Sequence, residues 1–182
     1  MRFEPRKIQD KNGNTIILRN AEKEDANELL NCMKTVTAET PYLIREPEEF
    51  VLTLEQEEQF IQSKIGDPGE LLLVAVYNGK HMGNCALMRV GTYKRYAHRC
   101  EVAIALYQKY CNLGIGKKMM EAVLESARNA GYEQAELEVI SSNTNAIRLY
   151  EKMGFQKYGT FPYNMKYKDG SYESADWMMK KL

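Results

Sequence analysis

Glu101–Lys118 reads EVAIALYQKYCNLGIGKK, and this stretch decides the fold of the chain. In its first part the side chains alternate between two faces, which predicts a buried strand. One face carries Val102, Ile104 and Leu106, and the other carries Glu101, Ala103 and Ala105. A short loop with Gly114 and Gly116 follows, and from Lys117 the apolar residues have helical spacing. A strand, a glycine loop and a helix in this order aim free main-chain N–H groups and a positive helix end at one point. That arrangement is typical of a phosphate site.

The loop alone leaves a second interpretation open, in which the two glycines only allow close packing between strand and helix. Two common phosphate loops do not match. A Walker A loop ends in Gly-Lys-Ser/Thr, whereas Lys117 is followed by Lys118. The dinucleotide fingerprint requires a third glycine and a downstream acidic residue in a βαβ frame.

A second stretch, Ser141–Phe155 (SSNTNAIRLYEKMGF), follows a predicted strand over Ala135–Ile140. Together the two stretches resemble the GNAT superfamily of acetyl-CoA-dependent N-acetyltransferases. The family motif Asn-x-x-Ala-x-x-Leu-Tyr-x-x-x-Gly-Phe is matched by Asn143, Ala146, Leu149, Tyr150, Gly154 and Phe155.

The family's diphosphate loop reads Gln/Arg-x-x-Gly-x-Gly/Ala. Gly114 and Gly116 match its glycines, and Cys111 stands at the Gln/Arg position. The loop binds phosphate mostly through main-chain N–H groups, so this change of side chain is compatible with binding.

Composition predicts one globular domain over residues 1–182, with residues 1–14 as a loose arm. The formal net charge is +0, which argues against nucleic acid as the main partner. No apolar run is long enough to span a bilayer, and the charged N-terminus does not resemble a secretory signal. The four cysteines are scattered and the histidines number two, which favours reduced thiols in a cytoplasm and no metal centre.

The other patterns predict a mixed α/β fold with a central twisted sheet and helices on both faces. Asn78-Gly79 and Asp169-Gly170 indicate hairpin turns, and Gly131 suits a helix C-terminus. The resemblance adds a splayed strand pair that holds CoA. The expected strands are Thr15–Leu18 (the first), Leu71–Tyr77, His81–Val90, Tyr96–Leu106, Ala135–Ile140 and one from Phe155, and the expected helices are Glu22–Val36, Glu55–Ile65 (Phe60 and Ile61 inward), Gly116–Asn129 and Asn143–Met153.

The resemblance implies acetyl-CoA as co-substrate, with its diphosphate on the glycine loop and its pantetheine arm along the central strand. It also implies that Asn143 contacts the CoA arm. Capping of the helix that Asn143 opens is the alternative role. The implied co-substrate residues are Ile104, Ala105, Leu106, Asn112, Leu113, Gly114, Ile115, Gly116, Lys117, Asn143, Ala146 and Tyr150.

N-acetylation requires a proton acceptor, because a free amine attacks the thioester and an ammonium does not. Glu101 is the leading candidate, and Glu138 or a water molecule is the alternative. The alternative is a purely structural role for Glu101, in which it forms an ion pair with Arg99. Tyr150 matches the family position of a general acid beside the CoA sulfur, and a phenol can donate to a thiolate.

The expected activity is therefore transfer of an acetyl group from acetyl-CoA to a primary amine, on a small molecule or a protein N-terminus, with a homodimer as a possible assembly. A catalytically inactive CoA-binding domain and a nucleotide-binding α/β protein are the alternatives. The irregular region 37–53 borders the acceptor pocket in the family. Tyr42, Leu43 and Phe50 either line that pocket or pack the loop.

Overall fold

The computed structural model describes residues 1–182 and places the quoted stretch at the centre of one eight-stranded sheet. The strand order is β1-β2-β3-β4-β5-β6-β8-β7, and every neighbouring pair is antiparallel except β5 and β6. The elements are β1 Arg6–Gln9, β2 Thr15–Asn20, α1 Ala26–Glu39, α2 Leu54–Gly66, β3 Leu71–Tyr77, β4 Lys80–Arg89, β5 Arg99–Leu106, α3 Ile115–Asn129, β6 Gln134–Ile140, α4 Thr144–Lys152, β7 Gln156–Lys166 and β8 Tyr172–Lys181.

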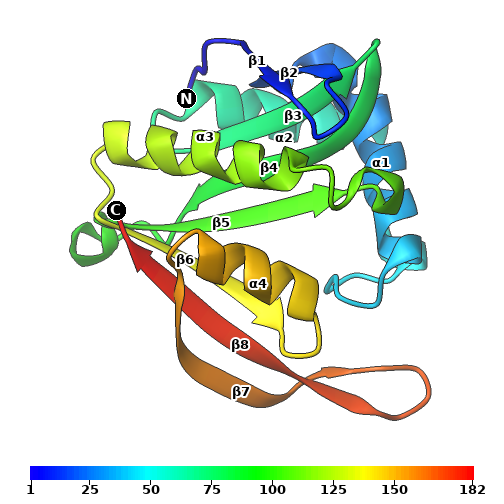
Figure 1. The fold of residues 1–182 in the computed structure, drawn as a ribbon, viewed down its shortest axis with the longest axis vertical. Coiled ribbons are helices and arrows are strands. Elements are labelled where there is room, and N and C mark those ends of the chain that lie inside the picture. The colour runs from blue at the N-terminus through cyan, green and yellow to red at the C-terminus, as the bar shows by residue number, and fades with distance from the viewer.

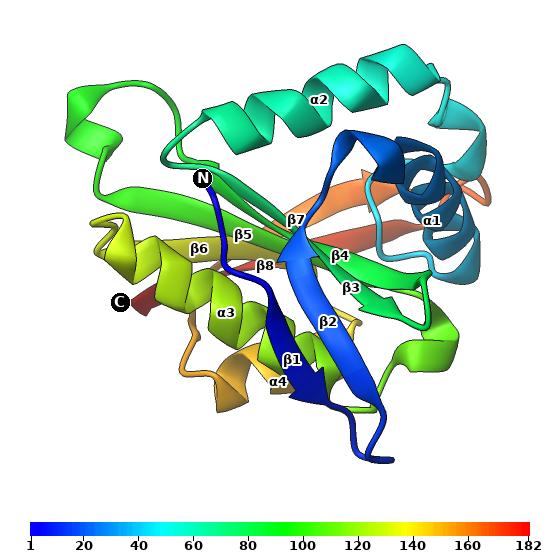
Figure 2. The ribbon, with the colours of Figure 1, turned by 90° about the horizontal axis from the view of Figure 1, so that it is seen from above.

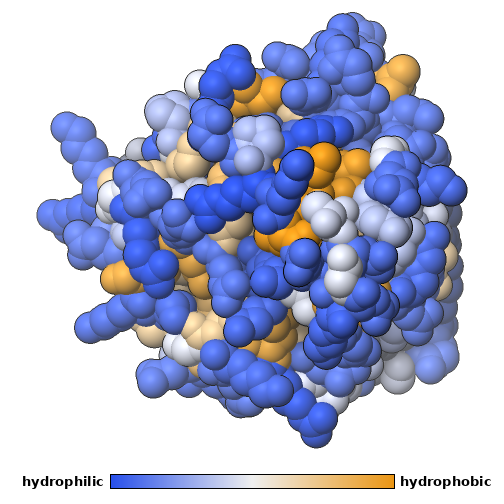
Figure 3. Space-filling view, turned by 45° about the horizontal axis from the view of Figure 1, so that its top comes forward, coloured by the Kyte–Doolittle hydropathy of each residue, from blue (hydrophilic) through white to orange (hydrophobic).

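Helices cover both faces of the sheet. α1 and α2 lie on one face, and α3 and α4 lie on the other, as the view from above shows (Figure 2). This confirms the predicted mixed α/β architecture. No helix combines the length and the hydropathy needed to cross a membrane. Hydrophilic side chains cover most of the face in Figure 3, with apolar residues in separate patches between them.

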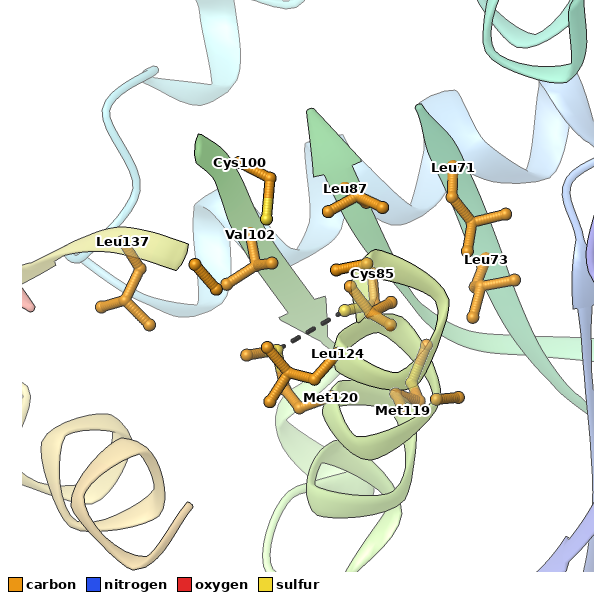
Figure 4. Packing of buried hydrophobic residues seen from close by; sticks show 14 of the residues in the cluster. Leu71, Leu73, Cys85, Leu87, Cys100, Val102, Met119, Met120, Leu124 and Leu137 are labelled. Carbon is orange, nitrogen blue, oxygen red and sulfur yellow. Dashed lines mark hydrogen bonds between the residues drawn. The ribbon is translucent and has the colours of Figure 1, made fainter. Parts of the chain in front are cut away.

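The main core lies between α3 and the central strands. Met119, Met120 and Leu124 of α3 face apolar side chains that β3, β4 and β5 present on one side of the sheet (Figure 4). The Cys85 thiol donates to the Met120 sulfur at 3.6 Å. Burial of this helical stripe against alternating strand residues fixes the register between α3 and the sheet. The strand residues drawn in Figure 4 include Leu71, Leu73, Cys85, Leu87, Cys100 and Val102.

Local signals account for several boundaries. Asn78 and Gly79 both have positive φ, 49° and 75°, as a tight two-residue hairpin turn requires. Thr53 accepts a hydrogen bond from the Gln56 N–H, and the Gln56 side chain accepts in return from the Thr53 N–H, so a capping box starts α2. Gly131, with φ 87°, follows the end of α3 as predicted.

The N-terminal segment differs from the expectation. Thr15–Asn20 is the second strand, and β1 precedes it within the segment expected as a loose arm. The Met1 ammonium also donates to the carbonyl oxygens of Lys64 and Glu70, each at 2.8 Å. β1 has the sequence RKIQ, which lacks apolar alternation, so its pairing rests on main-chain hydrogen bonds that no local pattern reveals.

Two smaller corrections concern β5 and α2. β5 begins at Arg99 rather than Tyr96, because Lys94–Tyr96 forms a 3₁₀ turn. On α2, Ile61 is fully buried as predicted, whereas Phe60 is 42% exposed and the Lys64 ammonium lies over its ring. Stacking under a cation keeps an aromatic ring at the surface without leaving it entirely in water.

Candidate functional site

The loop between β5 and α3 presents a row of free main-chain donors. The N–H groups of residues 112–117 donate to no main-chain or side-chain acceptor, although the flanking Cys111 and Lys118 N–H groups donate to Gln108 and Gly114. Asn112 and Gly114 take the left-handed conformation, with φ 63° and 84°, and this turns the chain sharply into the helix.

These donors lie partly in the interior, because Ile115 and Gly116 are buried. The first N–H groups of any helix lack intrahelical acceptors, and here Asn112 and Leu113 extend that set to six neighbouring donors, which suits a ligand with several acceptor oxygens. The positive end of the 15-residue helix α3 adds to the attraction for an anion. A diphosphate fits both requirements.

A gap in the sheet begins beside this loop. β5 and β6 pair only over Arg99–Glu101 and Gln134–Glu136, and then they separate (Figure 1). The other edge of β5 stays fully paired with β4. From residue 102 to 106 the edge of β5 that faces β6 has no strand partner, so its main-chain groups are available to an extended ligand.

The two sequence motifs meet at Gly116. A methyl group added there would lie 3.2 Å from Leu106 Cδ1, 3.5 Å from Ile104 Cδ1 and 3.8 Å from Leu149 Cδ2. The start of α3, the free end of β5 and the middle of α4 therefore touch one another. The structure thus brings together the glycine loop, the predicted strand residues and the residue before Tyr150.

Tyr150 is 8% exposed, and its ring meets Phe155 edge-on at 5.9 Å between centroids. Its hydroxyl makes no hydrogen bond within the chain and is not one of the fully buried polar atoms, whereas the Tyr132 hydroxyl donates to the Gly69 carbonyl at 2.8 Å. Burial, and to a lesser degree the Cys85 thiol, raises the pKa of Tyr150. The phenol therefore stays protonated and has a hydrogen bond to give.

Asn143 caps α4. Its side-chain oxygen accepts from the Ala146 N–H at 3.3 Å, which is the alternative role recognised from the sequence. Lys117 makes an ion pair with Glu121 at 3.5 Å, with both side chains more than half exposed. The Cys111 thiol contacts the Tyr107 carbonyl at 3.6 Å, and burial raises the pKa of this thiol.

Three carboxylates lie close together where β5 and β6 begin to separate. Arg99 binds Glu136 through two hydrogen bonds of 2.5 and 2.7 Å, which leaves Glu101 without an ion-pair partner. Glu138 accepts from the Asn164 amide and the Trp177 indole, each at 2.7 Å. Glu101 therefore does not form the structural ion pair with Arg99 that was the alternative to a catalytic role.

Glu101 is exposed on its strand face but lies beside two other carboxylates. Burial, followed by the nearby Glu138 and Glu136 carboxylates, raises the pKa of Glu101. A carboxylate with a raised pKa and no partner is a better proton acceptor than one held by two donors, as Glu138 is.

Glu101 and Tyr150 approach the gap from opposite faces of the sheet. Glu101 shares its strand face with Ala103 and Ala105, and Ala105 packs against α1. Tyr150 belongs to the core on the α3 face, with Val102. The two groups can therefore serve one reaction only across the open edge between β5 and β6.

A cleft of about 740 Å³ lies on the α1 side, between the α1–α2 loop and the end of β7. Leu43 lines it, while Tyr42 and Phe50 do not, and Phe50 is 8% exposed and packs the loop. The Tyr167 hydroxyl donates to the Pro41 carbonyl at 3.0 Å and links the two walls.

Sequence reasoning missed one contact of the loop. The Lys11 N–H, in the turn between β1 and β2, donates to the Leu113 carbonyl at 3.0 Å. The only local signal is the Asn12-Gly13 pair, which is typical of a hairpin turn and says nothing of its neighbour in space.

Comparison with known proteins adds an independent finding. Residues 27–155 match the model of the Acetyltransferase (GNAT) family. L-amino acid N-acetyltransferase AaaT of Escherichia coli is 28% identical over 142 residues, which cover 74% of this chain and 85% of that protein.

Solved structures agree with this match. An acetyltransferase of the GNAT family from Streptococcus pneumoniae has a TM-score of 0.88 and 27% identity, over 92% of this chain and 99% of that one. The yncA protein of Salmonella typhimurium, solved with its cofactor acetyl-CoA, has a TM-score of 0.81 at 18% identity, over 92% of this chain and 94% of that one.

Proposed function

Because this chain belongs to the acetyltransferase (GNAT) family, we propose that it moves the acetyl group of acetyl-CoA directly to a primary amine. The observation that carries this proposal is the row of six unpaired N–H groups at the start of α3, beside the gap between β5 and β6. A diphosphate joined to an extended, amide-bearing arm suits both features at once.

In this proposal the N–H groups of residues 112–117 bind the diphosphate of the co-substrate. The free edge of Ile104–Leu106 receives its amide-bearing arm, and Ala146 at the start of α4 borders the same gap. Asn143 contributes chiefly by capping α4, since its side-chain oxygen is already bonded to the Ala146 N–H.

Glu101 takes the proton of the incoming ammonium, directly or through a water molecule. Its carboxylate has no partner, and its raised pKa brings it closer to neutral pH. Glu138 instead holds Asn164 and Trp177 in place on the same face. The amine approaches from the face that carries α1, where the 740 Å³ cleft lies.

The free amine nitrogen then attacks the thioester carbonyl carbon. A C–N bond forms, the C–S bond breaks, and the electron pair leaves with sulfur as a thiolate. Tyr150 donates its hydroxyl hydrogen bond and a proton to that thiolate, and its oxygen takes up the second proton that the new amide nitrogen must lose, so CoA leaves as the thiol and Tyr150 returns to the phenol. Direct transfer requires no covalent enzyme intermediate, and no cysteine of the chain is placed for one, since three are buried and Cys111 contacts the Tyr107 carbonyl.

An inactive CoA-binding domain is the second candidate. It would preserve the phosphate loop without requiring an unpaired Glu101 or a largely buried Tyr150 whose hydroxyl makes no hydrogen bond within the chain, and the chain has both.

The test is release of free thiol from acetyl-CoA with a panel of amines. The panel contains free L-amino acids, because one relative bears that substrate in its name, as well as diamines and peptides with free N-termini. Turnover with any amine supports the enzyme. Binding of CoA by calorimetry without turnover on the whole panel supports the inactive domain, and absence of binding contradicts both.

A further inference from the structure

Several hydrogen bonds hold the turn between β1 and β2. The Asp10 carboxylate accepts hydrogen bonds from the Asn12 N–H at 2.8 Å, and from the Asn14 N–H and side-chain amide, each at 2.9 Å. The Tyr77 hydroxyl donates to the Asn14 side chain at 3.0 Å and ties the turn to β3. Lys11 lies inside this closed turn.

The turn touches the glycine loop through main chain and side chain. The Lys11 N–H donates to the Leu113 carbonyl at 3.0 Å. This bond holds the turn against the peptide that joins Leu113 to Gly114, whose N–H is one of the free donors. The Lys11 side chain passes over Gly114, with its Cγ 3.8 Å from the position of an added methyl group.

Lys11 is also uncommitted in charge. It is exposed and makes no ion pair, whereas Lys117 pairs with Glu121 and the Lys109 ammonium lies over the rings of Tyr107 and Tyr110. Lys118 is exposed and unpaired as well, and Lys11 differs from the other cations around the loop in that its side chain packs on Gly114.

We propose that Lys11 binds the diphosphate of CoA, so that the β1–β2 turn forms a second wall of the phosphate site. This inference rests on the proposed function. Lys11 lies outside residues 27–155, which match the family model, so the match does not assign it a role. The diphosphate, rather than the 3′-phosphate of the same molecule, is its target because Lys11 contacts Gly114, in the middle of the free donors.

The test is calorimetric binding of CoA, 3′-dephospho-CoA and pantetheine to the full chain. Lys11→Ala keeps the main-chain bond to Leu113 and removes the side chain beyond Cβ, including the ammonium and the Cγ that lies over Gly114. We expect it to weaken CoA and dephospho-CoA alike by about tenfold, the scale of one hydrogen bond to a charged group, and to leave pantetheine unchanged. Lys7→Ala, which removes a charge from the same hairpin, is the matched control and should bind CoA like the wild type.

Two further readouts separate an electrostatic role from a structural one. Lys11→Arg should restore most of the affinity, and the wild-type affinity should fall more steeply with salt than that of Lys11→Ala. Unchanged CoA affinity in Lys11→Ala overturns the inference. Loss with CoA but not with dephospho-CoA moves the contact to the 3′-phosphate and overturns the assignment to the diphosphate. A wild-type protein that does not bind CoA contradicts the proposed function itself.

Discussion

At the scale of single residues, the two groups proposed for catalysis both lack a hydrogen-bond partner within the chain. The Tyr150 hydroxyl and the Glu101 carboxylate make no hydrogen bond, whereas their neighbours Tyr132, Glu136 and Glu138 are all bonded. A polar group without an intramolecular partner beside a ligand site is free to bond to the ligand or to react with it, which favours a role in binding or chemistry.

Tyr150→Phe is expected to lower kcat on the order of 10²-fold or more and to leave the free energy of unfolding almost unchanged. The reason is that the lost hydroxyl has no partner in the folded chain. Tyr132→Phe is the matched control: it breaks the bond to the Gly69 carbonyl and should cost about 1 kcal/mol of stability while keeping activity. Single-turnover rates and urea unfolding measure the two effects. A Tyr150→Phe enzyme with normal turnover removes this residue from the mechanism.

Glu101→Gln is expected to lower kcat strongly and to leave the CoA affinity unchanged. In the wild type, kcat/KM should fall as the pH decreases through the pKa of Glu101, which lies above the ordinary glutamate value, because the protonated acid cannot accept a proton. The variant should lack this acidic limb. The pH profile of Glu138→Gln tests the alternative base, and loss of the limb in that variant instead would transfer the role to Glu138.

At the scale of elements, the start of α3 depends on a backbone conformation that favours glycine. Gly114 has φ 84°, and Gly131, just beyond the other end of α3, has φ 87°. An added methyl group would meet only the flexible Lys11 side chain at Gly114 and nothing at Gly131. The two positions therefore carry the same backbone strain in different surroundings.

Gly114→Ala and Gly131→Ala should each destabilise the chain by about 1–2 kcal/mol, the cost of the left-handed conformation for a residue with a Cβ. Only Gly114→Ala should weaken CoA, by about tenfold, because relief of the strain rotates N–H groups out of the donor row. Thermal unfolding and calorimetry compare the pair. Equal CoA affinity in both variants would contradict the role of the loop in binding.

Local patterns account for most elements and for part of the site. Leu71–Tyr77 has the predicted bounds, and the motif with Tyr150 meets the glycine loop at Gly116. β1 and the Lys11 contact escaped prediction because they depend on main-chain pairing and on proximity between distant parts of the chain. The sequence also does not reveal that Glu101 lacks an ion-pair partner, since only the fold shows that Arg99 binds Glu136 instead.

At the scale of the whole molecule, a buried charged cluster joins β2, α1 and β4. Asp25 accepts from Arg19 at 2.5 and 2.9 Å and lies 3.0 Å from His81, beneath the start of α1. Burial opposes the Asp25 charge, but the hydrogen bonds from Arg19 and His81 outweigh it, and the pKa of Asp25 is well below its usual range. The stability that this pair provides is present above the ordinary aspartate pKa and is lost as the pH falls toward the folded value.

Asp25→Asn should therefore cost about 3–5 kcal/mol at pH 7, because it leaves Arg19 partly buried without its counter-charge. The difference from the wild type should shrink as the pH is lowered below about 4, where the unfolded aspartate is protonated. Urea unfolding across this range measures it. Glu4→Gln, at a carboxylate without an ion pair, should show little change at any pH. A pH-independent Asp25→Asn difference would show that the cluster acts through packing alone.

The brief pairing of β5 with β6 has a mechanical consequence. Strand pairing between the five strands on one side of the sheet and the three on the other is limited to Arg99–Glu101 and Gln134–Glu136, and beyond these residues the two sides are joined by the core under α3. A ligand bound in the gap between β5 and β6 would contact both strands and restrain their separation. Occupancy by the donor would then set the spacing between the Glu101 and Tyr150 sides before an amine arrives, and the protein would assemble its own reaction geometry only when loaded.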